Sequence, residues 1–168
     1  MAGALLWLAL GSYLARRTLL AAPALPLLAP KQSTATQLTT HQTQNSLDQL
    51  NDATKTLNHL LENFDDIAKK DGGDGIRRLL GTVGTTSPLY RIQTALRVLA
   101  EDSSDPETFV ETLERALTEL QGADNDAYSS NFVTYSAAKA TPEDYWSRSK
   151  AGVTRLRMEL ETLQRLME

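Results

Sequence analysis

The sequence predicts an all-α fold, an up-down-up-down four-helix bundle that follows a non-globular N-terminal leader. From residue 46 onward, apolar residues recur at spacings of three, four and seven, as on one face of a helix. Helix-capping residues stand directly before proline at residues 87–88, 105–106 and 141–142, and proline is well tolerated at the first helical position. No stretch alternates convincingly at period two, and the short connections favour antiparallel neighbouring helices.

The length and composition suit one domain with an appended segment. The chain has 168 residues, of which 41% are hydrophobic, enough for a globular core. It has no cysteine, which excludes disulfides, thiolate metal sites and cysteine nucleophiles.

The charge is unevenly distributed along the chain. The only charged residues before Asp48 are Arg16, Arg17 and Lys31. Because the whole chain carries −4 and these three residues carry +3, the chain from Asp48 onward carries −7. Nonspecific nucleic-acid binding needs clustered cations that displace counterions, so we expect no nucleic-acid partner.

Residues 1–35 are expected to form a targeting leader of twin-arginine, thylakoid-like type. Residues 1–15 are apolar but shorter than the roughly 20 residues of a membrane span. Arg16 and Arg17 then precede a moderately apolar run, and residues 33–35 fit a small-x-small cleavage site. The alternative is a chance arginine pair inside a membrane-associated hairpin. Residues 36–45 are polar and nearly uncharged, and we expect a linker there, with the bundle over residues 46–168.

The first predicted helix begins at Ser46 as N-cap and ends at the sequence DGGDG, residues 71–75. A shorter segment follows and breaks at LLGTVGTTSPLYRI, residues 79–92, which holds two glycines, a proline and three threonines. These residues are poor in helix interiors. Ser87 and Pro88 are expected to start the helix again, with the sequence EDSSD at 101–105 ending it.

The last two predicted helices start at Asp105-Pro106 and Thr141-Pro142. In the third helix Gly122 is expected to form a kink or the end, with Tyr128 and Phe132 available to continue the apolar face. The apolar face of the fourth helix is predicted from Tyr145, Val153, Leu156, Leu160, Leu163 and Met167. None of the four predicted helices is apolar enough to span a membrane.

The sequence shows no pattern typical of catalysis or metal binding. Its two histidines are His41 in the polar segment and His59 on the first helix, without the Glu-x-x-His pattern of a di-iron bundle. Residues 71–75 and 124–131 lack the glycine and distal glutamate of a calcium loop, and there is no G-x-S-x-G. We therefore expect no catalytic or metal residues and no cofactor of its own, and a protein that works by binding.

Two stretches, together with the Arg-Arg leader, resemble a known family. They are DGIRRLLGTVGTTSPLYRIQTALRVLAED at residues 74–102 and YSSNFVTYSAAKATPEDYWSRSK at 128–150. They resemble the PsbQ-like lumenal extrinsic proteins of photosystem II, with the closest likeness to forms from algae with complex plastids. The resemblance extends from about residue 46 to the C-terminus.

This resemblance implies a non-catalytic subunit in the plastid thylakoid lumen, peripheral to the thylakoid membrane. Its partners would be the photosystem core and other lumenal extrinsic subunits, and it would stabilise the oxygen-evolving complex and the retention of calcium and chloride. Peripheral contact with chlorophyll or lipid is left open. One alternative is a linker subunit of photosystem I or its antenna, and another is an exported helical adaptor or ligand-binding domain unrelated to photosynthesis.

We expect the partner-binding residues to flank the break within residues 79–92. Arg77 and Arg78 stand just before the break, and Tyr90 and Arg91 stand just after it. A basic cluster on an acidic domain can orient association and make it sensitive to salt. The alternative is that Arg77 and Arg78 only cover the helix end through i, i+4 partners.

Trp146 is a further candidate for partner binding. Tyr145 is predicted to lie on the apolar stripe, and Trp146, the next residue, would then lie about 100° away around the helix. A large aromatic residue off the stripe is a candidate interface anchor. Covering the tail or a neighbouring helix would explain it equally well.

Overall fold

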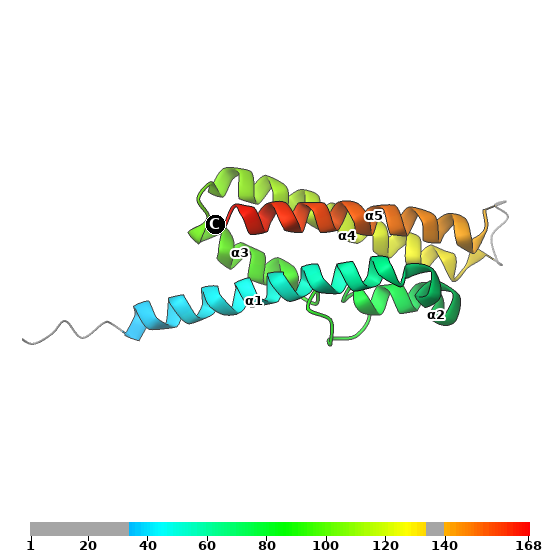
Figure 1. The fold of residues 1–168 in the computed structure, drawn as a ribbon, viewed down its shortest axis with the longest axis horizontal. Coiled ribbons are helices and arrows are strands. Elements are labelled where there is room, and N and C mark those ends of the chain that lie inside the picture. Colours follow the sequence, from blue (N-terminus) through cyan, green and yellow to red (C-terminus); the bar gives the residue numbers. More distant parts are fainter. Residues whose placement is uncertain (1–33, 134–139) are drawn as a thin grey trace, which may run out of the picture. The chain divides into compact units, whose positions relative to one another are not determined.

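The structure is a computed structural model that describes residues 34–133 and 140–168, with side chains from residue 40 onward. The leader expected at residues 1–35 therefore lies almost entirely outside the described residues. The described helices are α1 (Thr34–Glu62), α2 (Phe64–Leu79), α3 (Ile92–Asp102), α4 (Pro106–Ser130) and α5 (Pro142–Arg165). The described residues contain no strand, so the prediction of an all-α fold is confirmed (Figure 1).

The polar segment expected to be a linker is helical, which corrects the predicted start of the first helix. α1 begins at Thr34, and Ser46 is not an N-cap but a buried residue inside it. No glycine or proline interrupts residues 34–62, so nothing in the backbone stops the helix earlier. Within this segment, the Thr43 hydroxyl donates to Asp102 Oδ2 at 2.7 Å, which ties α1 to the end of α3.

The break predicted in the sequence DGGDG is present, at Gly72. This residue has φ 64° and ψ −160° inside α2, a conformation that glycine adopts readily because it has no Cβ. The chain turns back here, so that the second half of α2 runs beneath α1 (Figure 1). The apolar residues that recur at helical spacings from Leu47 to Ile67 are buried or half-buried, as predicted.

The expected helix start at Ser87-Pro88 is wrong. Residues 87–90 form a single turn in which the Tyr90 N–H donates to Ser87 O at 2.9 Å. Arg91 then adopts the left-handed conformation, with φ 55° and ψ 26°, which no α-helix continues through. α3 consequently starts at Ile92.

The starts of α4 and α5 are confirmed at their predicted residues. The Asp105 carboxylate accepts from the Thr108 N–H at 3.2 Å, with Pro106 in the first turn. Thr141 and Asp144 form a capping box, in which each side chain accepts a hydrogen bond from the other residue's backbone N–H. Such caps satisfy N–H groups that have no partner within the helix.

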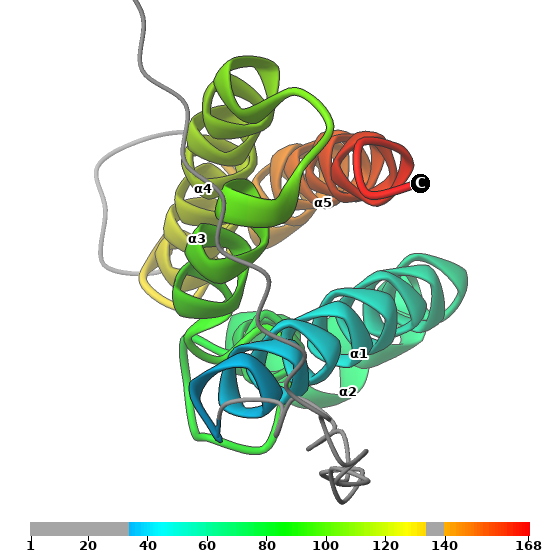
Figure 2. The ribbon, with the colours of Figure 1, turned by 90° about the vertical axis from the view of Figure 1, so that its left-hand side faces the viewer.

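The second half of α4 buries small residues in place of the predicted aromatic ones. The helix passes Gly122 and continues to Ser130, with Ala123 and Ala127 in the core, whereas Tyr128 and Phe132 are 48% and 47% exposed. α4 and α5 lie side by side (Figures 1 and 2), and the Ser149 hydroxyl of α5 donates to Ala123 O at 2.9 Å. A small residue at position 123 permits this close approach.

The core is formed by apolar residues from all five helices and from the segment between α2 and α3. Its largest fully buried side chains are Phe64, Phe109, Leu50, Leu57, Leu60, Ile76, Leu80, Leu96, Leu99, Leu156, Leu160 and Leu163. Among the described helices, none combines the length and the hydropathy needed to cross a membrane.

Candidate partner-binding site

The segment between α2 and α3 is a loop whose two ends meet. Gly81 has φ 73°, and a Cβ at this position would lie 2.4 Å from Tyr90 N. Only glycine therefore fits where the two ends of the loop approach each other. A compact loop with adjoining ends is an Ω-loop, a form that often carries function. Its middle residues 84–86 are exposed.

Hydrogen bonds to three helices hold the loop in place. The Thr82 hydroxyl donates to Asp124 on α4, and the Thr82 N–H donates to Arg77 O on α2 at 3.2 Å. Gln49 on α1 donates from Nε2 to Pro88 O at 2.9 Å and to Tyr90 O at 3.1 Å. These bonds restrict the loop backbone, so its exposed residues project from a fixed base.

Arg77 is the residue that joins the base of this loop to α4. Its Nε donates to Asp124 Oδ1 at 2.8 Å, its Nη1 donates to Asp74 Oδ1 at 3.2 Å, and its guanidinium lies 4.8 Å from the centre of the Tyr128 ring. Partial burial acts to lower the pKa of Arg77, but the hydrogen bonds and charges of Asp124 and Asp74 outweigh it and raise the pKa. Because only 18% of its side chain is exposed, Arg77 mainly stabilises the fold and is not a free surface cation.

Arg78 and Arg91 are the exposed cations beside the loop. The Arg78 side chain is 58% exposed and lies 3.9 Å from Asp71 Oδ1, a long ion pair. Arg91 is exposed, and its guanidinium lies 5.4 Å from the centre of the half-buried Tyr90 ring. Together with the exposed residues 84–86, these three side chains form what we call the loop surface (Arg78, Tyr90, Arg91 and residues 84–86).

An exposed aromatic pair close to the loop base was not predicted. The ring centres of Tyr128 and Phe132 lie 4.8 Å apart, tilted by 54°. Arg77 stacks on Tyr128 and also bonds Asp124, so one residue links this pair to the loop. The apolar periodicity made both rings available to continue the buried face, and only the crossing of α4 over α2 brings Tyr128 beside Arg77.

The structure corrects the position assigned to Trp146. Both Tyr145 and Trp146 are half-buried, but Trp146 packs against the core, whereas Tyr145 lies under Arg148, whose guanidinium is 4.2 Å from the ring centre. Trp146 stands seven residues before Val153 and fourteen before Leu160, a heptad relation that would have placed it on the buried face. Its packing against the core agrees with the alternative that it covers a neighbouring helix, and partner binding by Trp146 stays a prediction.

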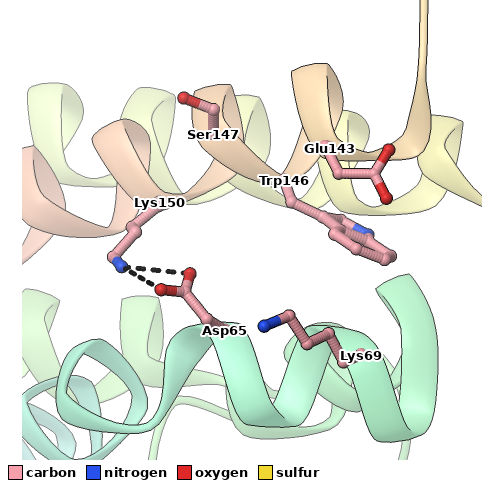
Figure 3. Close-up of a pocket in the computed structure, with 6 residues that line it drawn as sticks. All are labelled: Asp65, Lys69, Glu143, Trp146, Ser147 and Lys150. Carbon is pink, nitrogen blue, oxygen red and sulfur yellow. Dashed lines mark hydrogen bonds and ion pairs between the residues drawn. The ribbon is translucent and has the colours of Figure 1, made fainter.

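Trp146 lines a pocket of about 320 Å³ between α2 and α5 (Figure 3). The other lining residues are Asp65, Lys69, Glu143, Ser147 and Lys150. None of Arg77, Arg78, Tyr90 or Arg91 is among them, so Trp146 does not belong to the loop surface.

The histidines considered as possible ligands, His41 and His59, are both exposed on α1. Within residues 34–133 and 140–168, no three His, Asp or Glu side chains are grouped as they would be to hold a metal ion. Comparison of the chain with protein-family models, with curated proteins and with solved structures found no match.

Proposed function

We propose that this chain is a non-catalytic extrinsic subunit that docks through its loop surface on the lumenal side of photosystem II. It would stabilise the oxygen-evolving complex and help to retain its calcium and chloride. The observation that carries the proposal is an anchored loop flanked by exposed arginines on an otherwise acidic domain. The choice of partner rests on the resemblance of residues 74–102 and 128–150 to PsbQ-like proteins.

In the proposed arrangement, the five helices form an up-down-up-down bundle with four members. α1 with the first half of α2 would be one member, the rest of α2 with α3 the second, and α4 and α5 the third and fourth. Ion pairs between helices support such an assembly: Arg115–Glu159 at 3.3 Å, Arg155–Glu119 at 2.9 Å and Lys150–Asp65 at 3.1 Å. The shared apolar core of these helices would be the main support for a docking loop.

Electrostatics would give this docking its orientation. The chain from Asp48 onward carries −7, while Arg78 and Arg91 present positive charge beside the loop. A local patch of opposite sign steers one face of a protein towards an acidic partner and weakens as salt screens it. The twin-arginine leader would deliver the protein to the lumen, and N-terminal sequencing of the isolated protein tests whether it is removed.

Fractionation of photosynthetic membranes tests the function. Membranes of the organism that makes this chain are dissolved in mild detergent and separated on a sucrose gradient, and the chain is detected with an antibody. We expect the chain to migrate with photosystem II and to be released by a salt or alkaline wash. In a strain that lacks the chain, oxygen evolution should depend more strongly on added calcium and chloride. Migration with photosystem I would instead support the linker alternative, and separation from all chlorophyll would overturn both.

A further inference from the structure

The pocket between α2 and α5 has the volume of a small-molecule site, with one aromatic wall among polar and charged side chains. Its volume of about 320 Å³ lies within the range of roughly 300–1,000 Å³ that is usual for ligand pockets. One wall is the Trp146 indole, which reaches from α5 towards α2, and the opposite wall is formed by Asp65 and Lys69 (Figure 3). We refer to it as the α2–α5 pocket.

The indole of Trp146 offers the pocket an apolar aromatic surface. Its Nε1 is buried and has no hydrogen-bond partner among the residues that the structure describes. Because this atom has almost no accessible surface, a ligand in the open pocket meets the apolar face of the ring and not its N–H group.

Some charged side chains around the pocket are paired with each other, and others can still bind a ligand. Lys150 Nζ donates to both oxygens of Asp65, at 3.1 and 3.3 Å, so these two charges neutralise each other. Lys69 forms no ion pair with any described residue, and its ammonium group points into the space between Asp65 and the indole (Figure 3). The Glu143 carboxylate lies on the far side of the indole, where it would repel a second negative group.

From this arrangement we propose that the α2–α5 pocket binds a small amphipathic monoanion. Its planar apolar body lies against the Trp146 indole, and its single negative group lies beside the Lys69 ammonium. Ammonium-to-anion hydrogen bonds are stronger than neutral ones, which favours an anion over its neutral analogue. This site is distinct from the loop surface and does not depend on docking to a photosystem.

Fluorescence of the full chain tests the proposal with a defined probe. Trp7 is the only other tryptophan, so Trp7→Phe leaves Trp146 as the sole emitter. The probe is 8-anilinonaphthalene-1-sulfonate, an aromatic monoanion that accepts tryptophan emission. Its neutral analogue, N-phenyl-1-naphthylamine, lacks the sulfonate and serves as the matched ligand control.

The protein control compares two adjacent exposed lysines. Lys69 lines the pocket and Lys70 does not, so Lys69→Gln and Lys70→Gln remove the same charge from the same turn of the helix. We expect saturable quenching of Trp146 by the anion, with Kd raised about fivefold by Lys69→Gln and unchanged by Lys70→Gln. Binding of the neutral analogue should be equal in the two variants.

Two results would overturn the proposal: quenching that does not saturate, or equal effects of the two lysine substitutions on the anion. Thermal unfolding followed by circular dichroism shows that both variants are folded, as expected for exposed positions. Because the measurement uses the isolated full chain, a negative result here leaves the photosystem proposal untouched, and failure to migrate with a photosystem leaves this one untouched.

Discussion

Arg77 Nε lies 2.8 Å from Asp124 Oδ1, and this contact joins α2 to α4 directly beneath the loop. Both side chains are only 18% exposed. The Thr82 hydroxyl donates to the same carboxylate oxygen. Asp124 thus accepts hydrogen bonds from both α2 and the loop, and its partner Arg77 also stacks on Tyr128. The position of the loop surface therefore depends on Asp124.

Replacing Asp124 with alanine should lower the free energy of unfolding by about 1–3 kcal/mol, because two donors then lose their acceptor in a partly buried place. Asp126→Ala is the matched control on the same helix. Its partner Arg148 is 55% exposed and the pair is 3.7 Å apart, so we expect a loss of about 0.5 kcal/mol or less. Urea unfolding followed by circular dichroism measures both, and equal losses would contradict the role assigned to Asp124.

Gly73→Ala should destabilise the fold by about 2 kcal/mol or more, because α2 and α4 touch at this residue. A Cβ on Gly73 would lie 1.8 Å from Ala127 O, a backbone atom that cannot move without shifting α4. Gly122→Ala provides the comparison, since a Cβ there meets nothing within 4 Å. Alanine favours helix over glycine, so this variant should gain about 0.5–1 kcal/mol. Melting temperatures that move in the same direction would count against this packing.

The start of α5 should make stability depend on pH in acid. Hydrogen bonds from the backbone N–H and then the hydroxyl of Thr141 lower the pKa of Asp144 below its usual value. A carboxyl whose pKa falls on folding stabilises the fold above its unfolded-state pKa of about 4. This contribution is lost as the pH falls through the lower folded-state pKa.

Asp144→Asn should therefore lower the melting temperature near neutral pH, and its difference from the parent chain should shrink below about pH 4. Glu143→Gln removes a charge from the same helical turn but leaves the capping box intact, so its effect should be smaller. Thermal unfolding across this pH range measures both variants. A difference between Asp144→Asn and the parent chain that stays constant with pH would show that the carboxylate does not act through its charge.

Reversing the charges of the loop surface should weaken docking. The double variant Arg78→Glu and Arg91→Glu is expected to rebind salt-washed photosystem II membranes roughly tenfold more weakly, because the complementary charge is inverted. The control, Arg97→Glu with Arg165→Glu, changes the net charge equally at exposed residues on α3 and α5 that are outside the loop surface. Sedimentation with the membranes at increasing NaCl gives the affinities. Equal weakening by both pairs would indicate that net charge, and not the loop surface, controls binding.

Local chemistry explains why some helix ends were predictable and others were not. The caps at Asp105 and Thr141 are hydrogen bonds to residues three positions along the chain, so short sequences contain all their partners. Ser87-Pro88 has the same pattern but yields a single turn, because Arg91 takes the left-handed conformation and ends it. The predicted linker contains no helix breaker, and its polar composition alone was a poor reason to end α1.

By itself, the amino-acid sequence determined three features. The periodicity of apolar residues determined the all-helical character of the described residues, glycine determined the chain reversal at Gly72, and local capping determined the starts of α4 and α5. The packing of helices distant in sequence determined the rest. Gly73 lets α2 approach α4, which brings Arg77 to Asp124, while the approach of α5 to α2 sets Trp146 beside Lys69. Such pairs depend on the spacing and crossing of helices, which no short stretch of sequence encodes.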